Sequence, residues 1–392
     1  MAALSTDYPG TDYLIIGAGS MGMATADWLA RHSDASVQLL DAFSPPHEHG
    51  AHHGETRLLR QAYGEGSSYV PLARRALKLW KQLEEESGET LFQPTGVVNV
   101  GPPGAPFIAQ VEASARQHGL ALDSLPGDQL ARRWPGWALD DTLHGCFEHE
   151  AGVLFVERIL KCWRARVEHS PRIALATGAQ VIRLEAGEQG GWVAICADGQ
   201  RFGAERVLLS SGQCIAPLMA GLGVDLPLTR VRKTFAWYAC DARYAQDHFP
   251  GFSLTTPSGA IYYGFPDIEG AGFKMGRHDS GQPLESGEAM AAFGEHGDDV
   301  SELQQVVDRY FPGIGALRHG AVCQYIRTPD EHFLIDEPLP GLIVAGGFSG
   351  HGFKFASALG EALGIWIDQQ RRLPELALFG LARFSSLEGS TQ

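Results

Sequence analysis

The clearest pattern of hydrophobic and polar positions lies in the first 41 residues of the chain. Residues 13–16 form a short apolar run typical of a buried parallel strand, and a glycine-rich turn follows at 17–22. Residues 23–30 have the pattern of a helix, and a second apolar run at 37–40 ends at Asp41. This order predicts a βαβ unit that closes on an acidic residue.

The rest of the chain continues to alternate between short apolar runs and helical patterns. Strands are expected where apolar runs are bounded by turn residues, at 96–100, 192–196, 206–210 and 342–345. Helices are expected at 70–86, 106–119, 156–167, 301–310 and 355–362. This alternation predicts an α/β fold, and the apolar runs are far shorter than the roughly 20 residues that a membrane span needs.

Composition and charge narrow the choice of partners. A chain of 392 residues suggests two domains, and a net charge of −15 disfavours binding to nucleic acid or to an anionic membrane. The six cysteines are scattered without a CxxC pair or a metal-like histidine spacing, so reduced thiols and no metal are expected. The N-terminus lacks the basic and apolar segments of a signal peptide, which predicts a soluble, cytoplasmic protein.

The first glycine-rich turn has the spacing of a dinucleotide-binding loop. Gly17 permits the tight turn, Gly19 lets the backbone approach a pyrophosphate, and Gly22 allows close packing of helix and strand. Asp41 is placed to accept hydrogen bonds from a ribose. A second glycine-rich strand-to-helix turn at 346–352 favours FAD over NAD, because a late turn of this kind brings a helix dipole to the flavin.

Basic residues accompany both turns. Arg57 and Arg60 follow the first βαβ unit and would share a face if that segment were helical. Lys354 follows the second glycine-rich turn. A guanidinium group suits a carboxylate, so these residues are candidates for binding an acidic substrate group.

Six stretches carry a resemblance to a known family. The sequence resembles the monomeric sarcosine oxidase and N-methyl-L-tryptophan oxidase family, over roughly residues 12–375 and in the same order throughout. The matching stretches are GAGSMGMA (17–24), DAFSPPHEHGAHHGETRLLRQAYGEGSSYVPLA (41–73), YYGFP (262–266), GAVCQY (320–325), DEHFLID (330–336) and GGFSGHGFKFAS (346–357).

The resemblance implies a flavoprotein oxidase that demethylates small N-methyl amino acids with O2, and implies a monomer. It implies that the sulfur of Cys323 is bonded to the 8α-methyl group of FAD and that Lys274 activates oxygen. Arg57 would bind the substrate carboxylate with Lys354 as its partner, and Arg60 would support them electrostatically. Tyr263 and His278 would line the substrate site.

The resemblance also implies which residues hold the cofactor. They are Gly17, Ala18, Gly19, Ser20, Met21, Gly22, Asp41, Ala42, His52, His53, Thr56, Arg57, Val181, Ser211, Gly212, Cys323, Phe348, Gly350, His351, Gly352, Phe353 and Lys354. The expected fold is a Rossmann-like FAD-binding domain with a mainly antiparallel β-sheet substrate domain. The FAD-binding domain would comprise 1–91, 151–226 and 324–392, and the substrate domain 92–150 and 227–323.

Departures from the family leave the substrate open. Residues 212–214 read Gly-Gln-Cys, without the aromatic residue common there, and Arg277 precedes His278 where an aromatic residue is common. Residues 233–238 resemble the N-methyltryptophan branch, whereas 262–266 are equally close to the sarcosine branch. The alternatives are an oxidase of a cyclic or sugar-modified amino acid, an FAD dehydrogenase that passes electrons to a partner, and a non-enzymatic binding protein.

Overall fold

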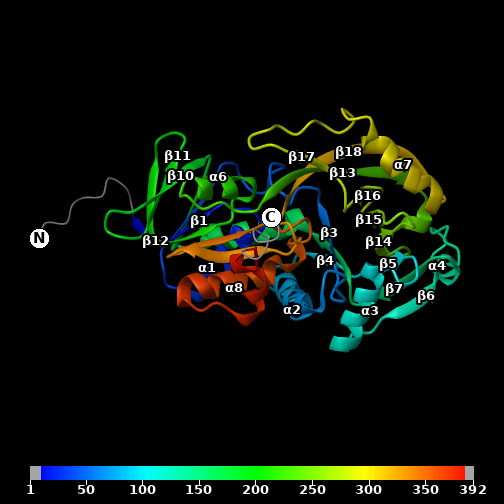
Figure 1. Cartoon of the computed structure of the whole chain (residues 1–392). Helices are drawn as coiled ribbons and strands as arrows, with labels where there is room; N and C mark the ends of the chain where they lie inside the picture. Colours follow the sequence, from blue (N-terminus) through cyan, green and yellow to red (C-terminus); the bar gives the residue numbers. More distant parts are fainter. Residues whose placement is uncertain (1–9, 385–392) are drawn as a thin grey trace, which may run out of the picture. The chain divides into compact units, whose positions relative to one another are not determined.

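The chain divides into two compact units. The computed structural model describes residues 10–384 (Figure 1). Unit 1 takes the chain up to His53, then Glu157–Arg230, and the chain from Tyr325 onward. Unit 2 comprises Gly54–Val156 and Val231–Gln324. Both units are therefore discontinuous in sequence.

Unit 1 is built on an eight-stranded sheet in the order β10-β11-β12-β1-β2-β9, with β20 pairing β12 and β19. Its central neighbours β20, β12, β1, β2 and β9 are parallel, whereas β10, β11 and β19 are joined by antiparallel pairs. The strands are β1 (Gly10–Ile16), β2 (Val37–Asp41), β9 (Ile173–Thr177), β10 (Val181–Ala186), β11 (Trp192–Cys196), β12 (Arg201–Leu209), β19 (Leu334–Leu339) and β20 (Leu342–Gly346).

Two helices of unit 1 pack closely through glycines, and Figure 1 shows them side by side. A Cβ on Gly360 of α8 would lie 2.5 Å from the Cβ of Ala24 on α1, and one on Gly364 would lie 2.3 Å from the ring of Trp28. Such contacts are too short for any residue with a side chain. The main helices of this unit are α1 (Ser20–His32), α5 (Val156–His169), α6 (Ile215–Ala220) and α8 (Ala356–Gln369).

Unit 2 is built on a nine-stranded sheet in the order β17-β13-β16-β15-β14-β5-β7-β6, with β18 also pairing β13. The pairs β13–β16, β16–β15, β15–β14, β5–β7 and β7–β6 are antiparallel, whereas β14 and β5 are parallel. The strands are β5 (Val97–Gly101), β6 (Asp123–Pro126), β7 (His144–Glu148), β13 (Thr229–Cys240), β14 (Gly251–Thr255), β15 (Ile261–Phe265), β16 (Phe273–Arg277), β17 (Gln282–Leu284) and β18 (Ile314–Arg327).

A second, three-stranded sheet completes unit 2, in the order β3-β8-β4. Its strands are β3 (Thr56–Leu59), β4 (Phe92–Gln93) and β8 (Gly152–Phe155). The helices of the unit are α2 (Val70–Ser87), α3 (Pro106–His118), α4 (Gly127–Arg133) and α7 (Asp298–Tyr310). An aromatic core that includes Trp137, Phe252, Phe273 and Phe311 fills the space beside the large sheet.

The structure confirms the predicted fold class and most of the predicted elements. Two details differ. Arg57 and Arg60 were expected to share a face only if their segment were helical. Residues 56–59 instead form the extended strand β3, which pairs with β8. Residues 54–91 and 151–156 lie in unit 2, whereas they were expected in the FAD-binding domain. Within residues 10–384, no helix is long and apolar enough to cross a membrane.

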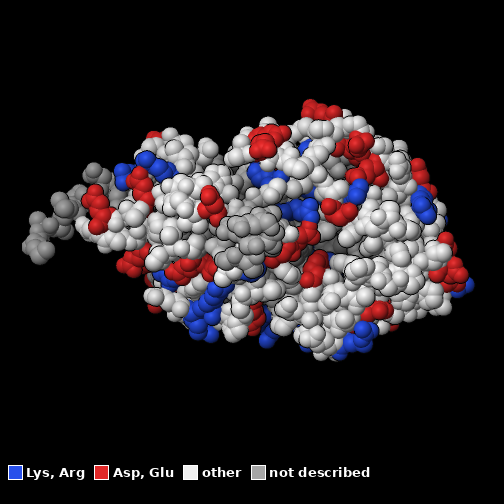
Figure 2. Space-filling view, in the orientation of Figure 1, with Lys and Arg blue, Asp and Glu red and all other residues white. Residues whose placement is uncertain are grey.

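Charged side chains are spread over the surface. On the face shown in Figure 2, acidic side chains cover many separate positions, and basic side chains are interspersed among them. The acidic side chains of that face are therefore not confined to one area of it.

Candidate functional site

The turn between β1 and α1 in unit 1 requires glycine at two positions. Gly17 has φ +99°, and a Cβ there would lie 2.7 Å from the carbonyl oxygen of Ser210. A Cβ on Gly22 would lie 1.9 Å from the carbonyl oxygen of Gly17. At Gly19 the nearest atom to a Cβ is Nδ1 of His52 at 3.6 Å, an ordinary contact distance, so no neighbouring atom crowds the backbone there. The turn thus leaves room for a ligand to approach the main chain.

Asp41 closes the same turn. One of its carboxylate oxygens accepts a hydrogen bond from the N–H of Ala18 at 2.7 Å, and the other accepts one from the N–H of Phe43 at 2.8 Å. Nε2 of His47 lies 3.3 Å from the second oxygen. The carboxylate is fixed in place, and its remaining lone pairs can accept hydroxyl donors such as those of a ribose.

Two observations test whether this turn fits a dinucleotide. The hydroxyl of Ser211 is buried and has no hydrogen-bond partner among the described residues, and its Cα would lie 2.7 Å from a Cβ on Gly17. The N-terminus of α1, which follows the same turn, has no side-chain cap and no acidic residue in its first turn. The helix therefore offers its N–H groups and positive end to an anion, and the residues fit the pyrophosphate of FAD.

Other predicted cofactor residues of unit 1 surround this turn. Val181 is buried in the same core cluster as Ile16 and Leu40, at the start of β10. Gly212 has φ +58° and begins a short 3-10 turn after Ser211. Ser20 and Met21 form the first turn of α1, while Ala42 and His53 lie in the segment that follows β2.

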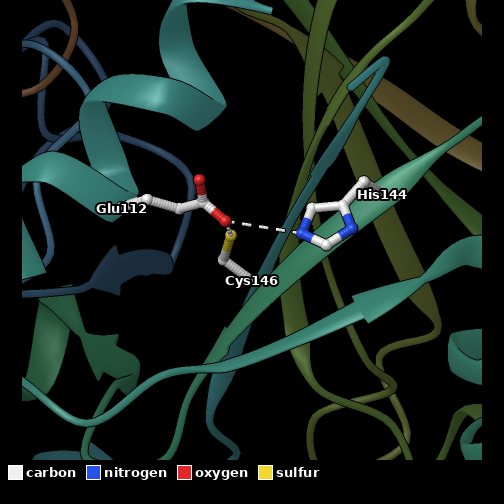
Figure 3. Close-up of side chains that lie close together, drawn as sticks. All are labelled: Glu112, His144 and Cys146. Carbon is white, nitrogen blue, oxygen red and sulfur yellow. Dashed lines mark hydrogen bonds and ion pairs between the residues drawn. The ribbon is translucent and has the colours of Figure 1, made fainter. Parts of the chain in front are cut away.

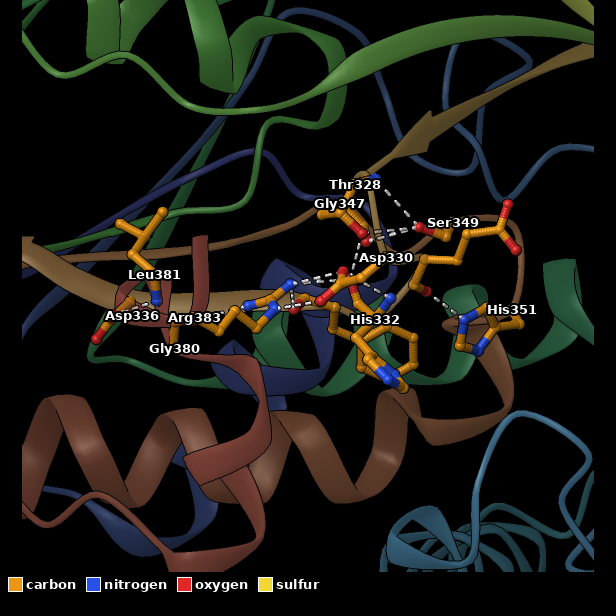
Figure 4. Close-up of polar contacts among 12 residues, drawn as sticks. Thr328, Asp330, His332, Asp336, Gly347, Ser349, His351, Gly380, Leu381 and Arg383 are labelled. Carbon is orange, nitrogen blue, oxygen red and sulfur yellow. Dashed lines mark hydrogen bonds and ion pairs between the residues drawn. The ribbon is translucent and has the colours of Figure 1, made fainter. Parts of the chain in front are cut away.

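The late glycine-rich turn is held by neighbouring segments of unit 1, as Figure 4 shows. The N–H of Ser349 donates to the carbonyl of Ile326 at 2.9 Å, and Nε2 of His351 lies 3.0 Å from the carbonyl of Glu331. A Cβ on Gly350, where φ is +83°, would lie 2.1 Å from the ring of Tyr325. These contacts fix the backbone that leads into α8.

Lys354 and two phenylalanines complete this turn. The Lys354 side chain is buried, and its ammonium donates to the carbonyl of His351 at 2.9 Å. The Phe348 ring packs edge-to-face on Phe333, with ring centroids 5.1 Å apart, and a Cβ on Gly352 would lie 2.6 Å from Phe348. Phe353 is buried in the 3-10 turn that precedes α8.

In unit 2, a buried lysine lies among aromatic rings on one face of the large sheet. Lys274 on β16 is directly opposite Trp237 on β13 and Phe265 on β15. Its ammonium nitrogen is 4.9 Å from the centroid of each ring and 5.1 Å from that of Phe235. Cross-strand pairing therefore builds a cation–π environment around Lys274, whose side chain is 3% exposed.

The N-terminal segment of unit 2 supplies the polar contacts of this lysine. The Lys274 ammonium donates to the carbonyl of Gly54 and to Oγ1 of Thr56, the latter at 3.1 Å. Burial lowers the pKa of Lys274 well below its usual value, and the neighbouring positive charge of Arg57 lowers it further. Glu55 and Cys323 act in the opposite direction.

Cys323 is buried on β18 and shares this electrostatic environment. Burial raises the pKa of the Cys323 thiol, whereas the positive charges of Arg57, Lys233 and Lys274 oppose that increase. Three cations therefore act on one thiol and would stabilise its thiolate form.

A second row of residues lies next to the lysine on the same sheet face. Gly276 is paired with Phe235 on one side and Tyr263 on the other. A Cβ on Gly276 would lie 2.7 Å from the Tyr263 hydroxyl, so the missing side chain makes room for the phenol. His278 follows this strand; its N–H donates to the carbonyl of Ile261 at 2.7 Å, and its carbonyl accepts from Lys233 at 2.8 Å.

The two arginines of the first motif have different environments. Because β3 is extended, side chains three apart point to opposite faces. The guanidinium of Arg57 donates to the carbonyl of Thr56 at 2.8 Å and acts on Lys274 and Cys323. Arg60 is buried elsewhere, paired with Glu65 at 2.8 Å and hydrogen-bonded to Oδ1 of Asn99 at 2.9 Å. The structure thus assigns only Arg57 to the surroundings of the lysine.

Several residues of this site were not predicted. Phe235, Trp237 and Lys233 share the inner face of β13 by strict alternation, which the run 233–238 displays in the sequence. The carboxylate of Glu148 accepts from the N–H groups of Gln61 and Ala62 and so fixes the end of β3, for which the sequence carries no signal.

Comparisons with known proteins agree with these features. The family model described as FAD dependent oxidoreductase matches residues 12–364. The chain is 40% identical to monomeric sarcosine oxidase of Bacillus sp. (strain B-0618) over 90% of each chain. It is 37% identical to N-methyl-L-tryptophan oxidase of Yersinia pestis (strain Pestoides F), over 95% of this chain and 99% of that one.

A solved structure shares the fold at lower identity. NikD, described as an unusual amino acid oxidase essential for nikkomycin biosynthesis, superposes with a TM-score of 0.83 at 19% identity, over 95% of this chain and 97% of that chain. The likeness extends over both units of the chain.

Proposed function

Because the chain belongs to the family of FAD-dependent oxidoreductases, we propose that it oxidises N-methyl amino acids, with sarcosine and N-methyl-L-tryptophan as the candidates. The reaction converts R-NH-CH3, O2 and water to R-NH2, formaldehyde and H2O2. The observation that carries this proposal is the buried Lys274, held by Thr56 and by aromatic rings in a chain closely similar to oxidases of both substrates.

FAD supplies the acceptor for two electrons from the N-methyl carbon. In its protonated form, Lys274 provides a positive charge at a fixed position where electron transfer to O2 develops negative charge. Its polar and aromatic contacts are already made, so little reorganisation is needed when that charge appears. Arg57 binds the substrate carboxylate, and Lys354 keeps the role of second cation that the resemblance implies. Tyr263 and His278 line the substrate site, and Arg60, which is bonded to Asn99 and Glu65, keeps the electrostatic supporting role that the resemblance implies.

Cys323 is the residue that we assign to the covalent link with FAD. The surrounding charges of Arg57, Lys233 and Lys274 support the assignment, since they oppose the effect of burial on the thiol pKa and a thiolate is the nucleophile in forming a carbon–sulfur bond. Forming the bond removes one proton from the thiol, one from the 8α-methyl group, and two electrons. The two electrons and two protons released when Cys323 forms this bond would end on O2 as H2O2.

We also propose a cytoplasmic monomer. The relative from Bacillus is named monomeric sarcosine oxidase, and none of the six cysteines, which all lie within residues 10–384, forms a disulfide, as in a reducing compartment. The mass of the purified protein in solution, measured by light scattering, checks the oligomeric state against the chain mass of 42.3 kDa.

A product assay tests the proposed reaction. Purified protein is incubated in air with sarcosine or N-methyl-L-tryptophan, and formaldehyde and peroxide are both measured. Equal amounts of the two products are expected from at least one substrate, and neither product from glycine or L-tryptophan. Turnover of a cyclic or sugar-modified amino acid in place of both N-methyl compounds would assign the chain to a sister specificity. Flavin reduction without peroxide would indicate a dehydrogenase.

A further inference from the structure

Three side chains with metal-binding atoms meet in unit 2, at the β6 end of the large sheet. Figure 3 shows Glu112 reaching from α3 toward His144 and Cys146 on β7. The two β7 residues are two apart and therefore share one face of the strand. Their ligand atoms and the Glu112 carboxylate oxygen all lie within 4.8 Å of one another.

The spacing of these atoms matches a tetrahedral metal. Nε2 of His144 is 3.4 Å from Oε1 of Glu112, and Sγ of Cys146 is 3.6 Å from the same oxygen. Ordinary zinc–ligand bond lengths at tetrahedral angles place such nitrogen–oxygen and oxygen–sulfur pairs about 3.4 and 3.6 Å apart. The nitrogen–oxygen and oxygen–sulfur distances of the cluster therefore already match those between neighbouring ligands of a tetrahedral zinc ion.

The neighbourhood supplies support and access. The hydroxyl of Ser124, which is paired with Cys146 across β6 and β7, donates to Oε1 of Glu112 at 2.9 Å and lies 3.5 Å from the sulfur. It orients the carboxylate as outer-shell groups of metal sites do. Cys146 is buried, whereas Glu112 and His144 are 31% and 26% exposed, so an ion can reach the ligands from solvent.

This cluster lies apart from the lysine site of the same unit. Cys146 is on β7 and Lys274 on β16, and three strands, β15, β14 and β5, separate them in the sheet. At about 4.8 Å between neighbouring strands, the two sites are roughly 19 Å apart. The sequence predicted no metal site, because the three ligands come from two elements and show no local motif.

We propose that Glu112, His144 and Cys146 form a binding site for a divalent cation of borderline softness such as Zn²⁺, with a fourth position open to water. The thiol proton passes to solvent when the metal–sulfur bond forms. Bound metal would connect α3 to the β6–β7 edge of the sheet. The site has no part in the proposed oxidation and does not depend on it.

Cobalt(II) is the probe that tests this site, because its absorption reports both thiolate bonding and tetrahedral geometry. Holoenzyme freed of metal with a chelator is titrated with Co²⁺, and the flavin spectrum recorded before addition is subtracted. We expect a near-ultraviolet sulfur-to-cobalt band and visible ligand-field bands that saturate at one equivalent. Zn²⁺ should displace them and raise the thermal unfolding midpoint.

Matched variants decide the outcome. Cys146→Ser, His144→Gln and Glu112→Gln should each lose the cobalt bands, whereas Cys214→Ser, at an exposed cysteine of unit 1, should keep them. The partly exposed His144 and Glu112 allow variants that still fold, which an unchanged flavin spectrum verifies. Wild-type protein without the bands, or full bands in any of the three ligand variants, would overturn the proposal.

Discussion

The ammonium nitrogen of Lys274 lies 3.1 Å from Oγ1 of Thr56, although the two residues are 218 positions apart in the chain. Lys274 lies on β16 of the large sheet, and Thr56 is the first residue of β3 in the three-stranded sheet. The same ammonium also contacts the carbonyl of Gly54 and faces Trp237 and Phe265. The position of this charge is thus fixed from two separate sheets of unit 2.

Replacing Lys274 tests its role in the reaction with oxygen. Lys274→Met should slow reoxidation of the reduced enzyme by about 10²–10³-fold, the usual effect of removing one preorganised charge-stabilising group. Thr56→Val keeps the charge and removes one hydrogen bond, so a loss of roughly tenfold is expected. Stopped-flow mixing of reduced enzyme with O2 measures both. Lys81→Met, at an exposed lysine of α2, is the control, and an equal effect there would contradict the assignment.

Gly276 should determine the position of the Tyr263 phenol. The Cβ in Gly276→Ala would lie 2.7 Å from the hydroxyl and 3.0 Å from the Cβ of Phe235, so the Tyr263 ring must move. We expect KM for the N-methyl substrate to rise about tenfold or more while reoxidation by O2 stays near the wild-type rate. A matched Gly297→Ala variant, with nothing within 4 Å of its Cβ and with φ −57°, controls for the general effect of adding a methyl group to a glycine of unit 2. Unchanged KM in Gly276→Ala would remove Tyr263 from the substrate site.

The covalent link predicts a simple colour test. Acid precipitation of the wild-type protein should leave the yellow flavin in the pellet, whereas Cys323→Ala should release it to the supernatant. Cys240→Ala, at another thiol of unit 2, should behave as wild type. Free flavin from the wild type would show that Cys323 is a structural thiol.

A buried ion pair in unit 2, Arg232 with Asp299, predicts how the free energy of unfolding changes as the pH is lowered. The Asp299 carboxylate binds the Arg232 guanidinium through two contacts of 2.7 and 2.9 Å, and both side chains are almost fully buried. The pKa of Asp299 lies below its usual value: burial alone would raise it, but the hydrogen bonds from Arg232 and from the N–H of Gly294 outweigh burial. Asp299→Asn should therefore cost about 3 kcal/mol at neutral pH, since it leaves a buried cation without its counter-charge.

The sign of the pH effect follows from the lowered pKa. A carboxylate with a depressed pKa stabilises the folded state above its unfolded value of 3.8, and this contribution is lost as pH falls toward the folded value. Denaturant unfolding of wild type and Asp299→Asn should thus converge below that pH. A difference in unfolding free energy that stays constant there would contradict the ion-pair assignment.

Local signals in the sequence were sufficient to predict the glycine-rich turn between β1 and α1. They were not sufficient to predict the surroundings of Lys274, because those depend on pairing between strands that are distant in the sequence. Gly17, Gly22 and Asp41 lie within one βαβ unit, where spacing alone fixes their geometry. The aromatic rings around Lys274 depend on the register of β13, β15 and β16, which no local pattern specifies.

The condition under which Arg57 and Arg60 would share a face, a helical segment at 57–60, is not met for a related reason. The spacing of two arginines fits a helix face, but pairing with β8 makes the segment a strand and separates Arg57 from Arg60. The cluster of Glu112, His144 and Cys146 was likewise invisible, because α3 and β7 meet only in the folded unit.

The most direct test of the proposed function is anaerobic mixing of the enzyme with sarcosine and, separately, N-methyl-L-tryptophan while the flavin absorption is followed. We expect complete bleaching by at least one substrate within catalytic times, return of the yellow colour when air is admitted, and one equivalent of formaldehyde per flavin. Bound flavin that neither substrate bleaches would contradict the proposal that this chain is an N-methyl amino acid oxidase.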